Sequence, residues 1–100
     1  MRSSVFHYPF EKVMRTTKGA LRHMGLKIVS FDKFDGRIQA VSGFSLRNPL
    51  LKVDLRVEEL INHDIKVTVN GHSTKVHFFQ RRKDDETSEA EILEKVSTLL

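Results

Sequence analysis

Two segments of the chain carry apolar side chains at the spacing of an amphipathic helix. In the first, apolar residues recur every three or four positions over residues 10–24, which places them on one face of a helix. Pro9 is typical of a first helical turn, and Gly25 is typical of the residue just past a helix end. We therefore predict a helix over residues 9–24, with Gly19 in its interior.

The second amphipathic segment lies at the C-terminal end of the sequence. Ser88 and Glu91 have the spacing of a capping box, in which each side chain bonds to a free backbone N–H of the first turn. The apolar stripe that follows consists of Ile92, Leu93, Val96, Leu99 and Leu100. We predict a helix over residues 88–100, preceded by a charged linker over residues 80–85.

Between these helices the sequence has the short runs that are typical of β-strands. Residues 51–57 alternate strictly between apolar and charged side chains, which indicates one buried face and one solvent-facing face. Residues 26–31 and 37–41 flank a turn at Asp35-Gly36, and Asp-Gly between β-rich runs favours a hairpin. A connection over residues 42–49 then leads to the alternating strand.

The register of the first hairpin depends on the length of its loop. A three-residue loop that ends in Gly36 places Ile28 and Ile38 on one face. A two- or four-residue loop instead groups Val29, Phe31, Ile38 and Ala40, because a shift of one residue exchanges the two faces of a strand. We favour the three-residue loop, which turns Val29, Phe31 and Val41 away from the helices.

A second hairpin is predicted at Asn70-Gly71, because the favoured two-residue turn requires positive φ at both positions. It follows a turn over residues 60–63 and a strand over residues 64–69, and it leads into a returning strand over residues 72–79. The resulting register pairs Val67 with Thr74, Ile65 with Val76, Lys66 with Lys75 and Asp64 with His77.

Together these elements predict one α+β domain over residues 1–100. Two helices with one apolar face each need a surface to cover, and an antiparallel sheet with one apolar face provides it. We expect a two-layer sandwich with the order α-β-β-β-β-β-α and with both helices on one face of the sheet. The other face of the sheet is expected to be open to solvent.

The charge of the chain is unevenly distributed. The formal net charge is +4, but residues 1–27 hold six basic residues against one acidic residue, whereas residues 84–100 hold six acidic residues against one basic residue. We favour two oppositely charged helices that pair along their rims, each exposed pair contributing about 0–1 kcal/mol. The alternative is that the basic first helix binds nucleic acid.

The composition excludes several kinds of chemistry. The sequence has no cysteine, so disulfides, thiolate metal sites, cysteine nucleophiles and a lipid-anchoring cysteine are excluded. It contains no phosphate loop, dinucleotide fingerprint or nucleophile elbow. The predicted register places His63 and His72 on the face opposite to His77, so we expect no metal site. We expect a non-enzymatic protein without a cofactor.

The location of the protein is predicted from what the sequence lacks. No apolar run approaches the roughly 18 residues of a membrane span. Residues 1–8 have no apolar signal core. These observations favour the cytoplasm.

The open face of the predicted sheet is the candidate binding site. Its tentative ligand or partner residues are Val29, Phe31, Val41, Lys52, Arg56, Lys66, Lys75, His77 and Phe79. An exposed apolar patch favours a protein partner or self-association. The alternative is single-stranded nucleic acid or another anion, because sheet-based modules combine aromatic side chains with basic ones for that purpose.

A family resemblance rests on residues between Ala20 and Ala40. The segment Ala20-Leu21-Arg22-His23-Met24-Gly25-Leu26-Lys27-Ile28 is followed by Asp32 and then by Gly36-Arg37-Ile38-Gln39-Ala40. This order of helix, strand, acidic turn and strand resembles the small repeated domain of BamC-like lipoproteins and of related bacterial families. The resemblance covers about residues 10–41. It implies an accessory interaction module, and it transfers no functional residue.

Overall fold

The computed structural model describes residues 1–42, 51–73 and 81–100, and for residues 51, 72–73 and 81–88 it describes the backbone alone. These ranges form two helices and one sheet of five antiparallel strands. The elements are β1 (Arg2–Phe6), α1 (Phe10–His23), β2 (Leu26–Asp32), β3 (Arg37–Ser42), β4 (Leu51–Glu59), β5 (Ile65–Ser73) and α2 (Arg81–Leu99). The predicted α+β class and the five-stranded antiparallel sheet are confirmed.

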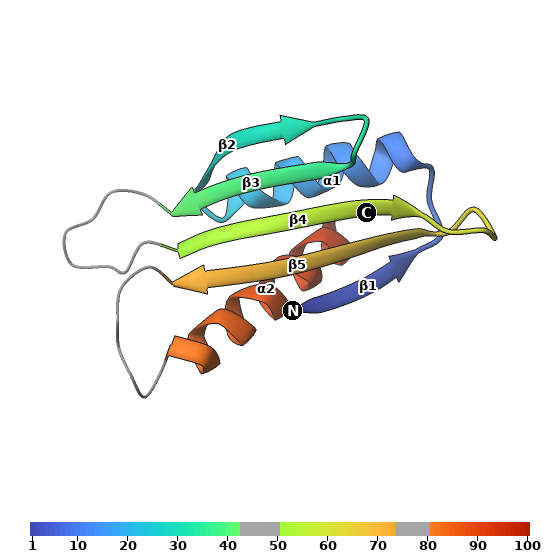
Figure 1. The fold of residues 1–100 in the computed structure, drawn as a ribbon. Coiled ribbons are helices and arrows are strands. Elements are labelled where there is room, and N and C mark those ends of the chain that lie inside the picture. The colour runs from blue at the N-terminus through green and yellow to red at the C-terminus, as the bar shows by residue number, and fades with distance from the viewer. Residues whose placement is uncertain (43–50, 74–80) are drawn as a thin grey trace.

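The predicted order of the elements is wrong at the start of the chain. The observed order is β-α-β-β-β-β-α, because residues 2–6 form a strand that the sequence pattern did not indicate. The order of strands across the sheet is β1-β5-β4-β3-β2, so β1 is an edge strand beside β5 (Figure 1). Only Phe6 of this strand is buried, and a single buried side chain gives no detectable alternation.

The predicted hairpin at Asn70-Gly71 is also wrong. These residues lie inside β5, opposite Asp54 and Val53 of β4. Gly71 does not have the positive φ that the turn would need. Lys66 consequently lies beside Glu58 and Val5. The remainder of the predicted strand 72–79, with Lys75 and His77, lies outside the described residues.

The turn predicted at residues 60–63 is confirmed as the β4–β5 hairpin turn. The N–H of Leu60 donates to the carbonyl oxygen of Asp64 over 2.7 Å, and the N–H of His63 donates to that of Leu60 over 2.9 Å. His63 has a φ of 69°, an uncommon conformation for a residue other than glycine. The turn therefore has a defined hydrogen-bonded shape at the end of the sheet.

Helix α1 agrees with the prediction to within one residue at each end. Pro9 is the N-cap, with an extended ψ of 147°, and Met24 is the C-cap. Gly25 follows with a φ of 77°, and its N–H donates to the carbonyl oxygen of Arg22 over 3.0 Å. Glycine adopts this left-handed conformation without the steric penalty of a Cβ atom, which explains why the helix ends there.

Gly19 lies in the interior of α1 beside open space. A Cβ atom built at this position meets no atom within 4 Å. Gly19→Ala is therefore expected to raise the free energy of unfolding by about 0.5–1 kcal/mol, because alanine loses less backbone entropy than glycine on forming a helix. Chemical denaturation measures the change. A loss of stability would show that α1 needs the glycine for a contact with the rest of the protein.

Helix α2 begins at Arg81, seven residues before the predicted start at Ser88. Ser88 is thus an interior residue of the helix, and the predicted capping box and charged linker are wrong. The added turns have no apolar side chain and consist of two arginines, one lysine, two aspartates, one glutamate and one threonine, of which arginine, lysine and glutamate have high helix propensity. The prediction followed the apolar stripe and therefore missed them.

Both helices lie on one side of the sheet in Figure 1, where α1 packs against β2 and β4 and α2 packs against β5 and β1. The core between the layers comes from one face of every strand and from one stripe of each helix. Its most deeply buried members include Val13, Leu21, Ile38, Val53, Val57, Ile65, Val67, Val69, Ile92 and Val96. In the described ranges, no helix covers the opposite face of the sheet.

A bulge in β2 determines which side chains of the first hairpin join the core. Asp32 pairs with Arg37, so the loop has four residues, and the favoured three-residue loop is wrong. Phe31 consequently lies opposite Ile38, on the helix side. The register then shifts between Ile28 and Ser30, which places Ile28 on this same side, opposite Ala40. An extra residue in one strand has this effect on the alternation of faces.

Candidate functional site

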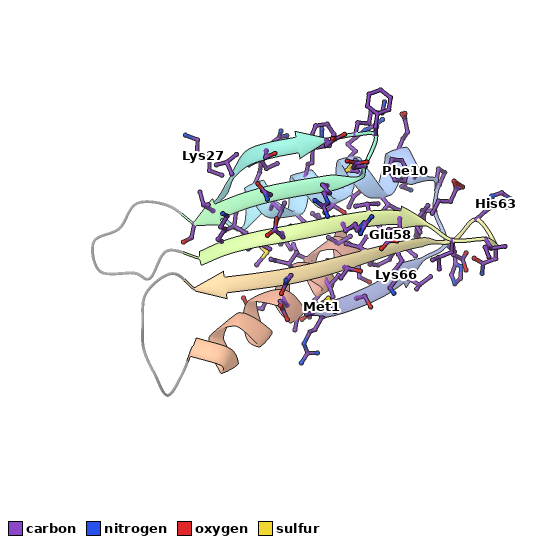
Figure 2. All side chains as sticks on the ribbon, in the orientation of Figure 1. Met1, Phe10, Lys27, Glu58, His63 and Lys66 are labelled. Atoms are coloured by element: carbon purple, nitrogen blue, oxygen red, sulfur yellow. The ribbon has the colours of Figure 1, made fainter. Side chains whose placement is uncertain are left out.

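The open face of the sheet holds four of the nine predicted site residues. Val41 and Lys52 are cross-strand partners there, Arg56 lies opposite Arg37, and Lys66 lies opposite Glu58. The labels in Figure 2 place Glu58 and Lys66 on neighbouring strands of this face. The face is polar and carries both signs of charge.

Of the other five predicted residues, the structure describes Val29 and Phe31. Phe31 lies on the helix side, where its ring centroid is 4.1 Å from Nζ of Lys18, so the prediction that it faces solvent on the open side is wrong. Val29 is the extra residue at the bulge and is 52% exposed. Lys75, His77 and Phe79 lie outside the described residues. Within the described strands, the open face has no aromatic side chain.

A shallow depression of about 370 Å³ crosses the open face. Its lining is mostly polar and includes Arg37, Gln39, Asp54, Arg56, Thr68 and Asn70. Arg37 and Arg56 are directly opposite each other, and no ion pair is formed by either among the described side chains. Two adjacent guanidinium groups can bind an anion, because each offers five donors and a fixed charge.

Three connections meet at one end of the sheet, which we call the loop end. It consists of residues 7–9 before α1, the β2–β3 turn at 33–36 and the β4–β5 turn at 60–64 (Figure 1). Phe34 and Ile61 stand at the tips of these two turns and are fully exposed, at 101% and 103%. Their side chains contribute nothing to the core, although both are large and apolar.

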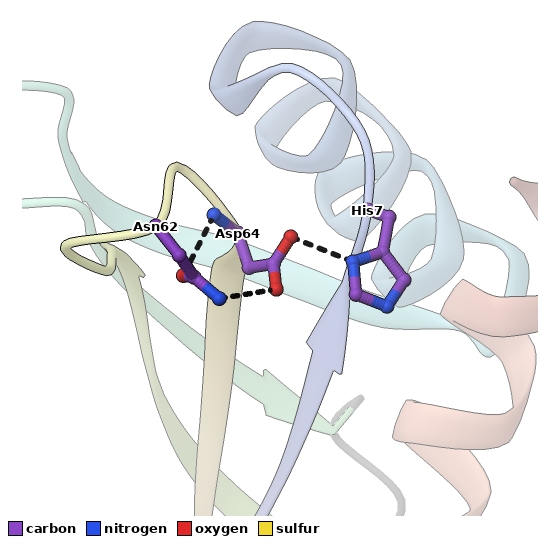
Figure 3. Close-up of polar contacts among 3 residues, drawn as sticks. All are labelled: His7, Asn62 and Asp64. Atoms are coloured by element: carbon purple, nitrogen blue, oxygen red, sulfur yellow. Dashed lines mark hydrogen bonds and ion pairs between the residues drawn. The ribbon is translucent and has the colours of Figure 1, made fainter.

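Hydrogen bonds hold the loop end in shape. Nδ1 of His7 lies 2.6 Å from Oδ1 of Asp64, and Nδ2 of Asn62 donates to Oδ2 of the same carboxylate over 2.8 Å (Figure 3). In the β2–β3 turn, Oδ1 of Asp32 accepts the N–H groups of Phe34 and Asp35 over 3.0 and 3.2 Å. The contact between His7 and Asp64 joins the connection before α1 to the β4–β5 turn.

A groove of about 170 Å³ adjoins the loop end between α1 and the β2–β3 hairpin. Phe10, Met14 and Phe31 supply its apolar surface. The remaining lining residues are Glu11, Arg15, Lys18 and Lys33. Nζ of Lys33 lies 3.1 Å from Oε1 of Glu11, so one ion pair joins the first turn of the helix to the hairpin.

Three of the six acidic residues of the predicted charge pairing, Asp84, Asp85 and Glu86, have side chains outside the described ones. Among the side chains that the structure describes, no ion pair joins α1 to α2. Lys12 lies over the ring of Tyr8 at 4.6 Å, and Lys18 lies over Phe31. The buried carboxylate of Glu89 on α2 is paired with the amino group of Met1 instead. Arg15 and Arg22 of α1 are exposed.

Sequence reasoning missed the loop end and the groove. The sequence feature that could locate the loop end is a large apolar residue at the tip of a turn, where polar residues and glycine are usual. Phe34 stands between Lys33 and Asp35, and Ile61 precedes Asn62. The alternation along the strands, which predicts the open face, cannot locate turn residues.

The remaining tests for a known type of site are negative. In the described part of the chain, no three histidine, aspartate or glutamate side chains gather where a metal ion could bind. No helix there has the length and apolar character needed to cross a membrane. The chain matches no model of a known protein family and no curated protein. The resemblance to the BamC-like domain stays a prediction.

Proposed function

We propose that this domain is a non-enzymatic protein-interaction module that binds its partner at the loop end. The observation that carries the proposal is the full exposure of Phe34 and Ile61 at the tips of two turns on the same end of the sheet. Burial of one such side chain in a partner stabilises a complex by about 1.5–3 kcal/mol. The absence of enzymatic activity and a cytoplasmic location stay predictions.

The fixed shape of the turns supports this proposal. Asp32 holds the backbone of Phe34 through its carboxylate, and the bond from Leu60 to Asp64 closes the turn that presents Ile61. A side chain presented on an ordered turn loses less conformational entropy on binding than one on a mobile loop. The two residues are therefore suitable anchors for an interface.

Strand addition at the sheet edges is a poorer route to association. Edge strand β2 contains a bulge at residues 28–30 and carries Lys27. Edge strand β1 has five residues and α2 packs against it. Bulges, charged side chains and short strands are the features by which proteins prevent edge-to-edge pairing. These features favour the loop end as the interface.

The alternative function is the binding of single-stranded nucleic acid or another anion on the open sheet face. It is favoured by the opposed pair of Arg37 and Arg56, because arginine forks match phosphate oxygens. Among the described residues this face has no aromatic side chain on which a base could stack, since Phe31 lies on the helix side. If a photo-cross-linking amino acid at position 52 captured nucleic acid and one at the loop end captured nothing, this alternative would be supported.

The proposal is tested by a photo-cross-linking amino acid placed at position 34, 61 or 52 in cells. We expect protein cross-links from positions 34 and 61 and none from position 52, which lies on the open face. Equal cross-linking from all three positions, or cross-linking from position 52 alone, would contradict a partner site at the loop end.

Substitution of the two anchors should separate binding from stability. Phe34→Ser and Ile61→Ser are expected to change the free energy of unfolding by less than about 0.5 kcal/mol, because both side chains are solvent-exposed. Each should weaken binding of the purified cross-linked partner about tenfold or more. Thermal unfolding and calorimetric titration measure the two effects. Val5→Ser is the matched control, since Val5 is a half-exposed apolar residue of the open face.

A further inference from the structure

The groove beside α1 has the size of a receptor for one apolar side chain. Its volume is about 170 Å³, and a cavity of about 150 Å³ is enough to hold benzene. Met14 is buried and Phe10 is partly buried against the core, so the apolar surface of the groove rests on fixed residues. Phe31 forms the wall on the side of the hairpin.

The groove continues into the loop end. Phe10 and Lys33 line both the groove and a second, shallower depression that includes Phe34. A ligand that contacts Phe34 at the tip of the β2–β3 turn can therefore extend directly into the groove. This continuity connects the groove to the interface proposed above.

The helix presents a row of cations that begins at the groove, where Arg15 and Lys18 are lining residues, and continues along α1 to Arg22. Arg15, Lys18 and Arg22 are three and four residues apart, which places them on the same side of α1. Arg15 and Arg22 are exposed, and Lys18 is half-buried against Phe31. Among the described residues none of the three has an ion pair. The acidic group of the groove, Glu11, is already held by Lys33.

We propose that this groove binds an acidic segment of a partner protein, with one apolar side chain of the segment seated between Phe10, Met14 and Phe31. The inference rests on the proposed function and specifies the chemistry of the partner. The apolar surface provides the anchor, and the row of Arg15, Lys18 and Arg22 attracts the acidic residues through charge complementarity.

The charges around the groove determine where the acidic residues of the bound segment lie. The depression around Phe34 is lined by Asp35, Glu58 and Glu59 as well as by Lys33 and Arg56. Carboxylates of the partner would be repelled there and attracted along α1. The acidic residues of the segment therefore follow the helix away from the loop end, and the apolar residue lies at the junction.

A peptide fits the groove better than a nucleic acid does. Stacking of a base needs an accessible aromatic face, and Lys18 lies over the ring of Phe31 at 4.1 Å. The cavity accepts a single apolar group, whereas single-stranded binding uses successive stacking positions along a groove. A nucleic acid is accordingly a competing outcome of the experiment.

The test selects peptides from a library of random 12-residue sequences displayed on phage, with the intact chain as the target. The charge-reversal variant Arg15→Glu/Arg22→Glu serves for counter-selection. We expect enrichment of sequences with one leucine, phenylalanine or methionine beside several aspartates or glutamates. In NMR titrations with these peptides, the amide shifts of the protein should centre on residues 10–18 and 31–33. The affinity of the peptides should fall as salt rises from about 50 to about 500 mM.

Matched variants locate the binding energy. Arg15→Glu/Arg22→Glu should weaken the selected peptide at least tenfold, whereas Lys27→Glu/Lys52→Glu, a charge reversal at two exposed lysines on other elements, should leave its affinity within twofold. Both variants change exposed residues, and their circular dichroism should match that of the parent. Replacement of the apolar peptide residue by alanine should also weaken binding at least tenfold.

Several results would overturn the inference. Two of them are the selection of basic or neutral peptides and an equal loss of peptide affinity in both charge-reversal variants. A third is preferential binding of the oligonucleotide dT12 at the same amides, and a fourth is amide shifts that depend on protein concentration without peptide, which indicate a second copy of the chain. The cross-linking experiment separates these results from the proposed function. If positions 34 and 61 still cross-link to a partner, the interaction module stands and only the acidic chemistry is wrong.

Discussion

Gly36→Ala is expected to lower the free energy of unfolding by about 3 kcal/mol or more, which combines a left-handed backbone penalty of about 1–2 kcal/mol with a steric clash. Gly36 has a φ of 66°. A Cβ atom built there would overlap the carbonyl oxygen of Val57. No rotamer can remove this clash, because both the Cβ position and the carbonyl belong to the backbone.

The surroundings of Gly36 prevent an inexpensive relaxation. The N–H of Val57 donates to the carbonyl oxygen of Gly36 over 2.7 Å, and the side chain of Val57 is buried in the core. Movement of either backbone would break this hydrogen bond or displace β4, the central strand of the sheet. The close approach of the β2–β3 turn to β4 therefore depends on glycine.

Gly25→Ala is the matched control for this prediction. Gly25 also has a positive φ, 77°, but a Cβ atom built there meets no atom within 4 Å. Its substitution should show only the left-handed penalty of about 1–2 kcal/mol. Urea denaturation of both variants measures the difference. Equal losses would mean that the turn at Gly36 moves away from β4 without penalty.

The predictable part of the fold is the part with long amphipathic periodicity or a local turn requirement. Helix α1 combines an apolar stripe with Pro9 and Gly25 at its ends, and all of these signals agree. The Asp35-Gly36 turn was also correctly located. The length of its loop was not, because the bulge at Val29 changes the face alternation, and periodicity alone cannot detect an extra residue.

Asn70-Gly71 shows how tertiary contacts override a strong local signal. The dipeptide favours a turn, but here it continues β5 beside β4. The buried Oε2 of Glu89 accepts the N–H of Gly71 over 2.8 Å. Glu89 belongs to α2 and is 18 residues away in sequence. No local pattern contains this information.

The candidate site was predictable only in part for a related reason. The alternation of β4 correctly placed Lys52 and Arg56 on the open face. The loop end and the groove are assembled from three connections and one helix that are distant in sequence. Phe10 and Phe31 meet there because β2 returns beside α1 with a bulge. Their proximity follows from the packed structure and not from either segment alone.

Glu89→Ala is the second substitution with a large expected effect, a loss of about 3 kcal/mol in the free energy of unfolding. Removal of one member of a buried charged pair costs about 3–5 kcal/mol, and the exposure of the other member reduces this figure. Glu89 is 1% exposed. Its Oε1 lies 3.0 Å from the exposed amino group of Met1, as an ion pair without a well-directed hydrogen bond. Its Oε2 accepts the N–H of Gly71.

The role of this carboxylate follows from the sheet. Pairing between β1 and β5 ends at Arg2 and Val69, so the N–H of Gly71 has no partner on β1. Glu89 takes the place of the missing strand and satisfies this buried donor. Its loss would leave the donor unpaired, which costs about 1–3 kcal/mol, and would leave a cavity between α2 and β5.

Two further variants separate the contributions. Glu89→Gln keeps an acceptor for Gly71 but removes the charge opposite the Met1 amino group, so a smaller loss of about 1–2 kcal/mol is expected. Glu91→Ala is the control, because Glu91 is an exposed residue of the same helix, and it should change stability by less than about 0.5 kcal/mol. Chemical denaturation of the three variants at one pH measures the order of their losses in the free energy of unfolding. If Glu89→Ala were no more harmful than Glu91→Ala, the buried carboxylate would not be what fixes α2 to the end of β5.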